Sequence, residues 1–155
     1  MAYTQQPTAT PGMNVGGGNR NSKNLPVEGD GREWSESLFG CFEDITTCLI
    51  ATCFPCITYS NVKHRYEHLN NKGYPDPEHG GSFCNGDCMV HGCLTFCGCG
   101  WAMQMGTRGN IRGRYNIKGG AVGDCCIALC CTPCELTQES RELALEEESF
   151  NGKQG

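Results

Sequence analysis

The sequence lacks the features that mark secreted, lipid-anchored and nucleic-acid-binding proteins. Its first residues, MAYTQQPTATPG, contain neither the basic nor the apolar stretch that a signal peptide requires. It has no Asn-x-Ser/Thr acceptor for glycosylation, Ala2 is incompatible with N-myristoylation, and no prenylation box ends the chain. Basic residues number 12 against 17 acidic ones, and this net charge of −5 argues against general nucleic-acid binding. We therefore expect the chain to start in the reducing cytosol and to bind no nucleic acid.

Apolar residues are also scarce for a domain of this size. Only 38% of the 155 residues are hydrophobic even with cysteine included, and 22 are glycine. A core of this kind needs additional staples. The chain has 14 cysteines, a density at which a disulfide or metal scaffold is the default expectation. In a reducing compartment clustered cysteines more often bind metal than pair covalently, so we expect a small cysteine-rich domain stapled by metal.

The chain length predicts one domain with two tails. Residues 1–31 are rich in Gly, Asn, Pro, Thr and Gln, and they are predicted to form a disordered tail. The cysteine-rich domain is assigned to residues 32–148, and residues 149–155 are assigned to a disordered C-terminus.

One cysteine pattern occurs twice. The pattern C-x4-C-x-P-C spans Cys48 to Cys56 and again Cys126 to Cys134, with three cysteines and a proline at matching positions. Each copy ends in a C-x2-C bracket, whose two intervening residues turn both sulfurs toward one point. Two such brackets are the usual way to place four thiolates around a tetrahedral zinc ion, with Zn–S distances of ~2.3 Å. The two halves of the domain would then meet at the metal.

The repeat therefore predicts a metal site, with zinc as the expected cofactor. The two brackets supply the favoured ligands, and the first cysteine of each copy is a partner or replacement. The predicted ligands are Cys48, Cys53, Cys56, Cys126, Cys131 and Cys134. Thiolates select zinc, copper(I) and, by their softness, cadmium.

The fold is expected to be mainly α. Glu43 and Asp44 precede an apolar run, as acidic residues do at helix starts, and Pro55 should break the helix that follows. A second helix is predicted from about Ile57 to Leu69, where apolar residues recur at helical spacing.

A last helix is predicted to begin at Pro133, because proline suits the first turn of a helix. Its buried face should carry Leu136, Ser140 and Leu143. Three consecutive glutamates, residues 146–148, are unfavourable at a helix C-terminus, so the helix is expected to fray there.

The segment Cys88–Met105 is apolar apart from His91 and Gln104. Its 18 residues only just reach the length that spans a membrane, and its glycines weaken an isolated helix. A buried core helix or a shallow membrane insertion is favoured over a true span. A third interpretation is that this segment forms part of a second metal cluster together with Cys99.

The next segment, TRGNIRGRYNIKGG, carries four basic residues and no acidic one. A short amphipathic helix ended by Gly119 and Gly120 is expected. Its cations either hold the apolar segment at the cytoplasmic side and bind anionic lipid, at ~1 kcal/mol each, or form internal salt bridges with the acidic tail. The sequence favours neither.

Three motifs occur in order: CFPCITY, RGNIRGRYNIKGG and DCCIALCCTPCELTQESREL. With these motifs the stretch from about Trp34 to Leu143 resembles the cysteine-rich family of placenta-specific protein eight. That family includes the plant cell-number regulators and plant cadmium-resistance proteins. The resemblance implies a non-enzymatic protein, membrane-associated, with a role in heavy-metal tolerance, ion movement or growth control. Plant members often carry Cys-Pro-Cys in the first motif, whereas Phe54 precedes Pro55 here, which puts metal movement in doubt.

Three functions remain open at this stage. The first is a membrane-associated module that binds zinc or another soft metal, with its domain facing the cytoplasm and a homo-oligomer as a possible form. The second is a structural, zinc-stapled interaction module. The third is a thiol–disulfide enzyme that uses C-x-P-C, although no strand pattern precedes either copy as that motif requires. Attachment to the membrane could be peripheral, integral, or through palmitoylation of Cys125, Cys126 or Cys130.

Overall fold

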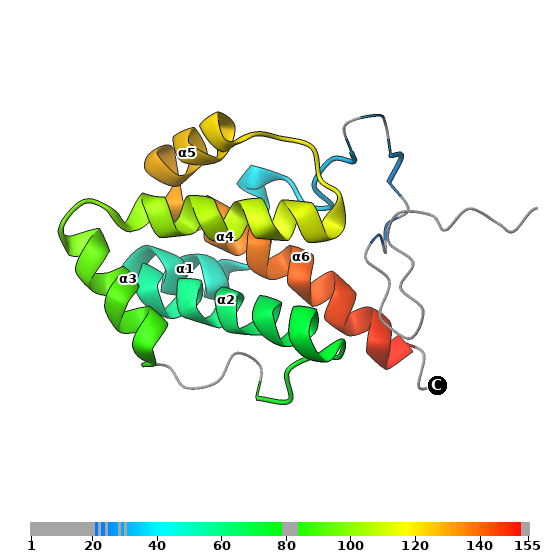
Figure 1. Ribbon diagram of the computed structural model, residues 1–155, viewed down its shortest axis with the longest axis horizontal. Coiled ribbons are helices and arrows are strands. Elements are labelled where there is room, and N and C mark those ends of the chain that lie inside the picture. The colour runs from blue at the N-terminus through cyan, green and yellow to red at the C-terminus, as the bar shows by residue number, and fades with distance from the viewer. Residues whose placement is uncertain are drawn as a thin grey trace, which may run out of the picture.

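The computed structural model describes residues 21, 23, 25–27, 29, 31–78 and 84–152, the last two by backbone alone. Most of the predicted N-terminal tail, and residues 153–155, lie outside this part. The described residues confirm a mainly helical fold, and they contain no strand beyond an isolated bridge between Arg32 and Ile117. The elements are η1 (Leu38–Glu43), α1 (Ile45–Cys53), α2 (Pro55–Lys72), α3 (Gly86–Phe96), α4 (Gly100–Tyr115), α5 (Ala121–Cys130) and α6 (Thr132–Gly152) (Figure 1).

Local chemistry sets the ends of these helices. The side chain of Asp44 caps α1 by accepting the N–H of Thr47, at 3.2 Å. Pro55 interrupts the first helix, as the sequence predicted, and it also opens α2, earlier than the expected start at about Ile57, because proline suits the first helical position. The C-cap of α4 is Asn116, which has a left-handed conformation with φ of 52°. The expected end of that helix at Gly119 and Gly120 is therefore wrong, since asparagine had already ended it.

The apolar segment Cys88–Met105 is not one helix. It belongs to α3 and α4, which are separated at Cys97–Cys99. Gly98, with φ of 82°, turns the chain there in a conformation that few other residues adopt. The interpretation of this segment as one continuous helix, buried or spanning, is therefore corrected.

Helix α6 is the central element and packs against η1, α1 and α2 (Figure 1). Helix α3 packs against α2 and α4, and α5 packs against α4. Two small apolar clusters form around it. The larger contains Val62, Leu69, Ile111, Tyr115, Ile117 and Leu143, and the smaller contains Ala51, Tyr59 and Leu136. Leu136 and Leu143 are buried as predicted, but Ser140 is only partly buried. These clusters are small for the size of the domain, in line with the low apolar content.

The interior is completed by charged side chains. Four glutamates of α6 are buried: Glu135, Glu139, Glu142 and Glu146. Glu142 binds Arg32 at 2.6 Å, and Glu146 binds Arg114 at 2.8 Å. Burial raises the pKa of Glu135 to about 7 and that of Glu139 well above the usual value for a glutamate, because desolvation penalises the ionised carboxylate.

These pairs also explain why α6 does not fray where the sequence predicted. Glu146 accepts hydrogen bonds from Arg114 and Tyr115, and Glu147 is held by Arg65 at 2.5 Å. Tertiary ion pairs therefore outweigh the unfavourable interaction of the glutamates with the helix dipole. The helix continues to Gly152, beyond the expected start of the C-terminal tail.

Candidate functional site

Three breaks between consecutive helices gather at one end of the domain, which we call the junction end. They lie at Phe54 between α1 and α2, at Cys97–Cys99 between α3 and α4, and at Cys131 between α5 and α6. All three contribute to one cavity, which is lined by Ala51, Thr52, Pro55, Thr95, Gly98, Gly100, Trp101, Gln104, Ala128, Leu129, Thr132 and Pro133. The two halves of the repeated pattern therefore lie close together in space, with both prolines at the same cavity.

Both copies of the pattern fold in the same way. One residue interrupts the helix in each copy, Phe54 with φ of −135° and ψ of 68°, and Cys131 with φ of −148° and ψ of 74°. The interruption falls one position earlier in the second copy, and a proline lies in the first turn of each following helix. The α1–α2 pair bends by 119° at this point. The pattern C-x-P-C thus encodes a helix–break–helix here, because proline cannot continue the preceding helix.

The junction end carries no carboxylate, lysine or arginine side chain, and its titratable groups are cysteines, the buried His91 and the buried Tyr59. Residues 45–62, 88–107 and 125–134 contain no Asp, Glu, Lys or Arg. Large apolar side chains are exposed here: Phe96 is 95% exposed, Leu129 60% and Phe54 58%. Apolar side chains outside and charged ones inside reverse the usual arrangement of a water-soluble domain.

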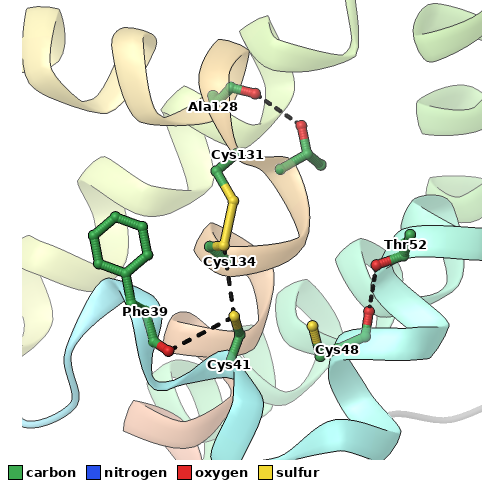
Figure 2. Close-up of a disulfide and its surroundings, with 8 residues drawn as sticks. Phe39, Cys41, Cys48, Thr52, Ala128, Cys131 and Cys134 are labelled. Carbon is green, nitrogen blue, oxygen red and sulfur yellow. Dashed lines mark hydrogen bonds between the residues drawn. A yellow bond between two sulfur atoms is a disulfide. The ribbon is translucent and has the colours of Figure 1, made fainter.

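The second C-x2-C bracket is closed. Cys131 and Cys134 form a disulfide (Figure 2), which differs from the expected pair of metal-bound thiolates. The sulfur of Cys134 also lies 3.6 Å from that of Cys41, a residue of η1. Cys48 of α1 contacts Cys41, and burial followed by this contact raises the pKa of the Cys48 thiol. One group of four sulfurs therefore joins η1, α1 and the start of α6.

Cys56, from the first C-x2-C bracket (Cys53 and Cys56), faces a different group of thiols. Cys56 contacts Cys88 of α3 and also lies next to Gly92 of the same helix. Burial, and then Cys56, raise the pKa of Cys88 to about 12, so Cys88 stays a thiol at neutral pH. An apolar surface cavity at this place is lined by Cys56, Cys84, Cys88, Met89, Gly92, Cys93, Phe96 and Cys97.

The predicted ligands are thus divided between different surroundings. Cys56 faces α3, Cys134 contacts Cys41, and both Cys53 and Cys126 are exposed. Within residues 31–78 and 84–150, no three or more His, Cys, Asp or Glu side chains are arranged to hold a metal ion in this structure. Metal binding by the predicted six cysteines stays a prediction.

Sequence reasoning missed Cys41, and it considered Cys88 only as part of a second cluster with Cys99 rather than as the neighbour of Cys56. Each meets its partner through long-range packing: 93 positions separate Cys41 from Cys134. Neither lies in a C-x2-C bracket, so no spacing rule singles it out. The only signal for Cys41 was its position beside the aromatic residues that open the domain.

The basic segment after the apolar one turns inward. Arg108 donates to Asp124 and Gln138, Arg112 to Asp124, and Arg114 to Glu146. Arg108 also stacks on Trp34, with 4.2 Å between its guanidinium carbon and the ring centre. The structure shows internal ion pairs for all three arginines, and Arg114 pairs with Glu146 in the acidic tail as one interpretation expected. Arg108 and Arg112 instead pair with Asp124, and lipid binding stays a prediction.

This helical, cysteine-rich domain with its two C-x-P-C junctions belongs to the PLAC8 family, whose family model matches residues 34–142. Among curated proteins, the chain is 35% identical to the protein plant cadmium resistance 1 of Arabidopsis thaliana over 111 residues, covering 72% of this chain and 67% of that protein. It is 34% identical to plant cadmium resistance 2 of the same plant, with 72% and 66% covered. It is 29% identical to cell number regulator 3 of Zea mays, with 77% and 66% covered.

The chain thus spans about two thirds of the length of these relatives, and a third of each lies outside the match. No solved structure matches the chain significantly. Among the described residues no single helix is both long and apolar enough to cross a membrane, although the bent α1–α2 pair reaches that length and composition together.

Proposed function

We propose that this protein is a non-enzymatic, membrane-associated protein whose clustered thiols bind zinc or another soft metal ion, in heavy-metal tolerance or growth control. The observation that carries the proposal is the junction end, where three helix breaks bring together exposed aromatic side chains, cysteines and no charge. The printed names of the relatives, which refer to cadmium resistance and to cell number, agree with this role.

Membrane association follows from what is exposed at the junction end. Phe54, Phe96 and Leu129 each gain about 1.5–3 kcal/mol when fully removed from water. No charged side chain has to be desolvated with them, and the helical backbone satisfies its own hydrogen bonds. Shallow insertion of this end, with the rest of the domain in the cytoplasm, fits these features better than attachment through arginines that are already paired.

Metal binding follows from the number and kind of sulfurs near the same end. Exposed thiols occur at Cys53, Cys97, Cys99, Cys126 and Cys130. Thiolates prefer zinc, copper(I) and cadmium to hard ions such as magnesium. The disulfide of the second bracket has to be reduced before that bracket can contribute ligands.

Metal content tests the metal part of the proposal. The full chain is expressed in a reducing cytosol, purified without oxygen and analysed by elemental mass spectrometry. We expect bound zinc, and less of it in C131S/C134S than in C99S, which alters an exposed cysteine outside both patterns. Folded wild-type protein that carries no metal, and takes up neither zinc nor cadmium, would contradict the proposal.

Vesicle flotation tests the membrane part. We expect the wild-type chain to float with lipid vesicles and the triple variant F54D/F96D/L129D to stay in solution. V122D is the matched control, because Val122 is 79% exposed but lies at the opposite end of α5 from the junction. Equal flotation of both variants would locate the lipid contact elsewhere, and a carbonate wash distinguishes a peripheral from an integral protein.

A thiol–disulfide enzyme is the second candidate, favoured by one observation. The C-T-P-C bracket forms a disulfide, and the thiol of Cys41 is its neighbour. The bracket opens a helix that follows another helix, however, and redox enzymes of this motif place it after a strand. Rapid reduction of insulin by the protein would favour the enzyme, and the non-enzymatic proposal expects none.

A further inference from the structure

Four sulfur atoms lie together where η1, α1 and the start of α6 meet. The disulfide joins Cys131 and Cys134, and Cys41 lies 3.6 Å from the sulfur of Cys134. Cys48 contacts Cys41 from α1, and Figure 2 shows its sulfur turned toward the other three. Cys41 is 2% exposed and Cys134 8%, whereas Cys48 and Cys131 are half-buried, so the group lies at the edge of the interior. No other cluster in the described residues draws its sulfurs from both copies of the repeat.

The surrounding structure holds Cys41 and Cys48 in place. Arg141 of α6 donates to the carbonyl oxygen of Gly40 at 2.8 Å, which fixes η1 on α6 next to Cys41. A Cβ at Gly40 would lie 2.7 Å from the Arg141 guanidinium, so a larger residue there would displace this side chain from its place beside η1. Asp44 then starts α1 at once through its cap on Thr47, and this turn brings Cys48 back to Cys41.

We propose that Cys41, Cys48, Cys131 and Cys134 form a redox-gated site for a zinc-type ion, closed in the disulfide form and open in the reduced form. This inference rests on the proposed metal function, but it replaces Cys53 and Cys56 by Cys41 and Cys48. It also accounts for the finding that no three potential ligands in the described residues are arranged for a metal. With the disulfide formed, only two of the four sulfurs are free.

The spacing suits a tetrahedral thiolate site. With Zn–S bonds of about 2.3 Å, the sulfurs of such a site lie about 3.8 Å apart. Cys41 and Cys134 are already 3.6 Å apart without a bond between them. Cys131 and Cys134 flank the N-terminus of α6, where the helix dipole and free N–H groups stabilise thiolates.

Opening the site is a two-electron reduction. A dithiol reductant attacks the Cys131–Cys134 bond through its thiolate, forms a mixed disulfide, and then closes to its own cyclic disulfide. Both protein sulfurs leave as thiols, and the reductant loses the two electrons that they gain. Binding of Zn²⁺ to the four thiols then releases four protons and leaves a centre with two net negative charges. In the reverse direction, a disulfide oxidant accepts two electrons from Cys131 and Cys134 through a mixed disulfide and becomes a dithiol. The Cys131–Cys134 bond forms again, the ion is released, and Cys41 and Cys48 take up protons.

The test compares zinc binding by two redox forms of the same full-length protein. One sample is reduced with a dithiol, which is removed without oxygen, and the other keeps its disulfide, as verified by peptide mass mapping. We expect one zinc ion to bind the reduced form at least about tenfold more tightly than the disulfide form. The disulfide form lacks two of the four ligands, and losing even a group that supports a metal ligand costs affinity on this scale. Loading with Co²⁺ should give the visible spectrum of a tetrahedral four-thiolate site.

Variants identify the ligands. C41S and C48S should each weaken zinc binding by the reduced protein at least about tenfold, whereas C53S and C126S, at exposed positions, should not. Because Cys41 is buried and C41S could unfold the domain, circular dichroism is recorded for each variant. If C41S does not fold, zinc binding by C48S and the cobalt spectrum of the wild-type protein decide whether these four cysteines are the ligands.

The outcomes separate the two proposals. No metal binding in either redox form overturns both the metal function and the site. Binding that is equal in the two forms, or that falls in C53S and C56S but not in C41S and C48S, leaves the metal function standing and overturns this site. Cobalt spectra that show fewer than four thiolates overturn it as well.

Discussion

Arg32 and Glu142 form a buried ion pair with 2.6 Å between guanidinium nitrogen and carboxylate oxygen, although 110 positions separate them in the chain. Their side chains are 1% and 2% exposed. Ser35 also donates to the same carboxylate, through its backbone N–H at 3.0 Å and its hydroxyl at 2.8 Å. The residue that opens the domain is thereby attached to its last helix.

Removing one partner of this pair should destabilise the domain strongly. E142A leaves the guanidinium of Arg32 buried without its carboxylate, so we expect a loss of about 3–5 kcal/mol in the free energy of unfolding. The double variant R32M/E142M removes both charges of the pair. It should therefore lose less free energy of unfolding than R32M or E142M alone. Denaturant unfolding followed by circular dichroism gives all values, and additive losses would contradict the coupling.

Truncation of Leu136 tests the core. Leu136 is fully buried between Ala51 and Tyr59, so L136A should cost about 2–5 kcal/mol through lost burial and a cavity. Leu129, which is 60% exposed, is the control, and L129A should change stability by less than about 0.5 kcal/mol. Urea unfolding of both variants is the measurement, and similar losses would place Leu129 in the core too.

Histidine 91 should make stability fall as the solution becomes acidic. Burial lowers the pKa of His91 from 6.5 to about 4, and Gln104 donates its amide N–H to Nε2, which therefore carries no proton. The unfolded chain takes up a proton near pH 6.5 while the folded one does not until about pH 4. Stability owed to neutral His91 is thus complete above pH 6.5 and is lost as the pH falls toward 4.

The slope is at most about 1.4 kcal/mol per pH unit in that window. Since Glu135 titrates with the opposite sign in the folded state, the quantity to measure is the difference between wild type and H91Q. That difference should shrink steadily between pH 6.5 and 4. A difference that does not vary with pH would show that His91 titrates normally in the folded protein.

Alkylation rates should separate the cysteines of α3. The pKa of Cys88 is raised to about 12, so only a small fraction of this side chain is thiolate at pH 8. Cys88 is also buried, so the reagent cannot reach its sulfur. Cys97, at the end of the same helix, is exposed. Brief treatment with iodoacetamide followed by peptide mass mapping should modify Cys97 and spare Cys88, and in urea both should react. Equal modification of the native protein would contradict the burial of Cys88.

The helical class and several boundaries could be predicted because they depend on local chemistry. Pro55 had to end α1, and Asp44 marked where that helix begins. The break between α3 and α4 was hidden inside an apolar run, where hydrophobicity outweighed the signal from Gly98. The end of α4 was missed because asparagine was not considered as a left-handed cap.

The candidate site was predicted less well. Bracket spacing correctly marked Cys131 and Cys134 as a pair, but spacing alone does not report the redox state that joins them. The contact of Cys134 with Cys41 depends on how α6 packs on η1, which no local pattern encodes. The inward direction of Arg108 was equally hidden, because its partners Asp124 and Gln138 follow much later in the chain.

The acidic face of α6 limits how this helix can be placed. Two of its buried glutamates meet different cations: Glu142 meets Arg32, and Glu146 meets Arg114. Sliding the helix by a single turn would pull both carboxylates from their guanidiniums while keeping them out of water, at a cost of several kcal/mol for each abandoned charge. An apolar helix face would tolerate such a shift, because it has no charge to leave unpaired. The glutamates therefore exclude neighbouring misaligned packings, so that a domain with few apolar side chains still adopts a single arrangement.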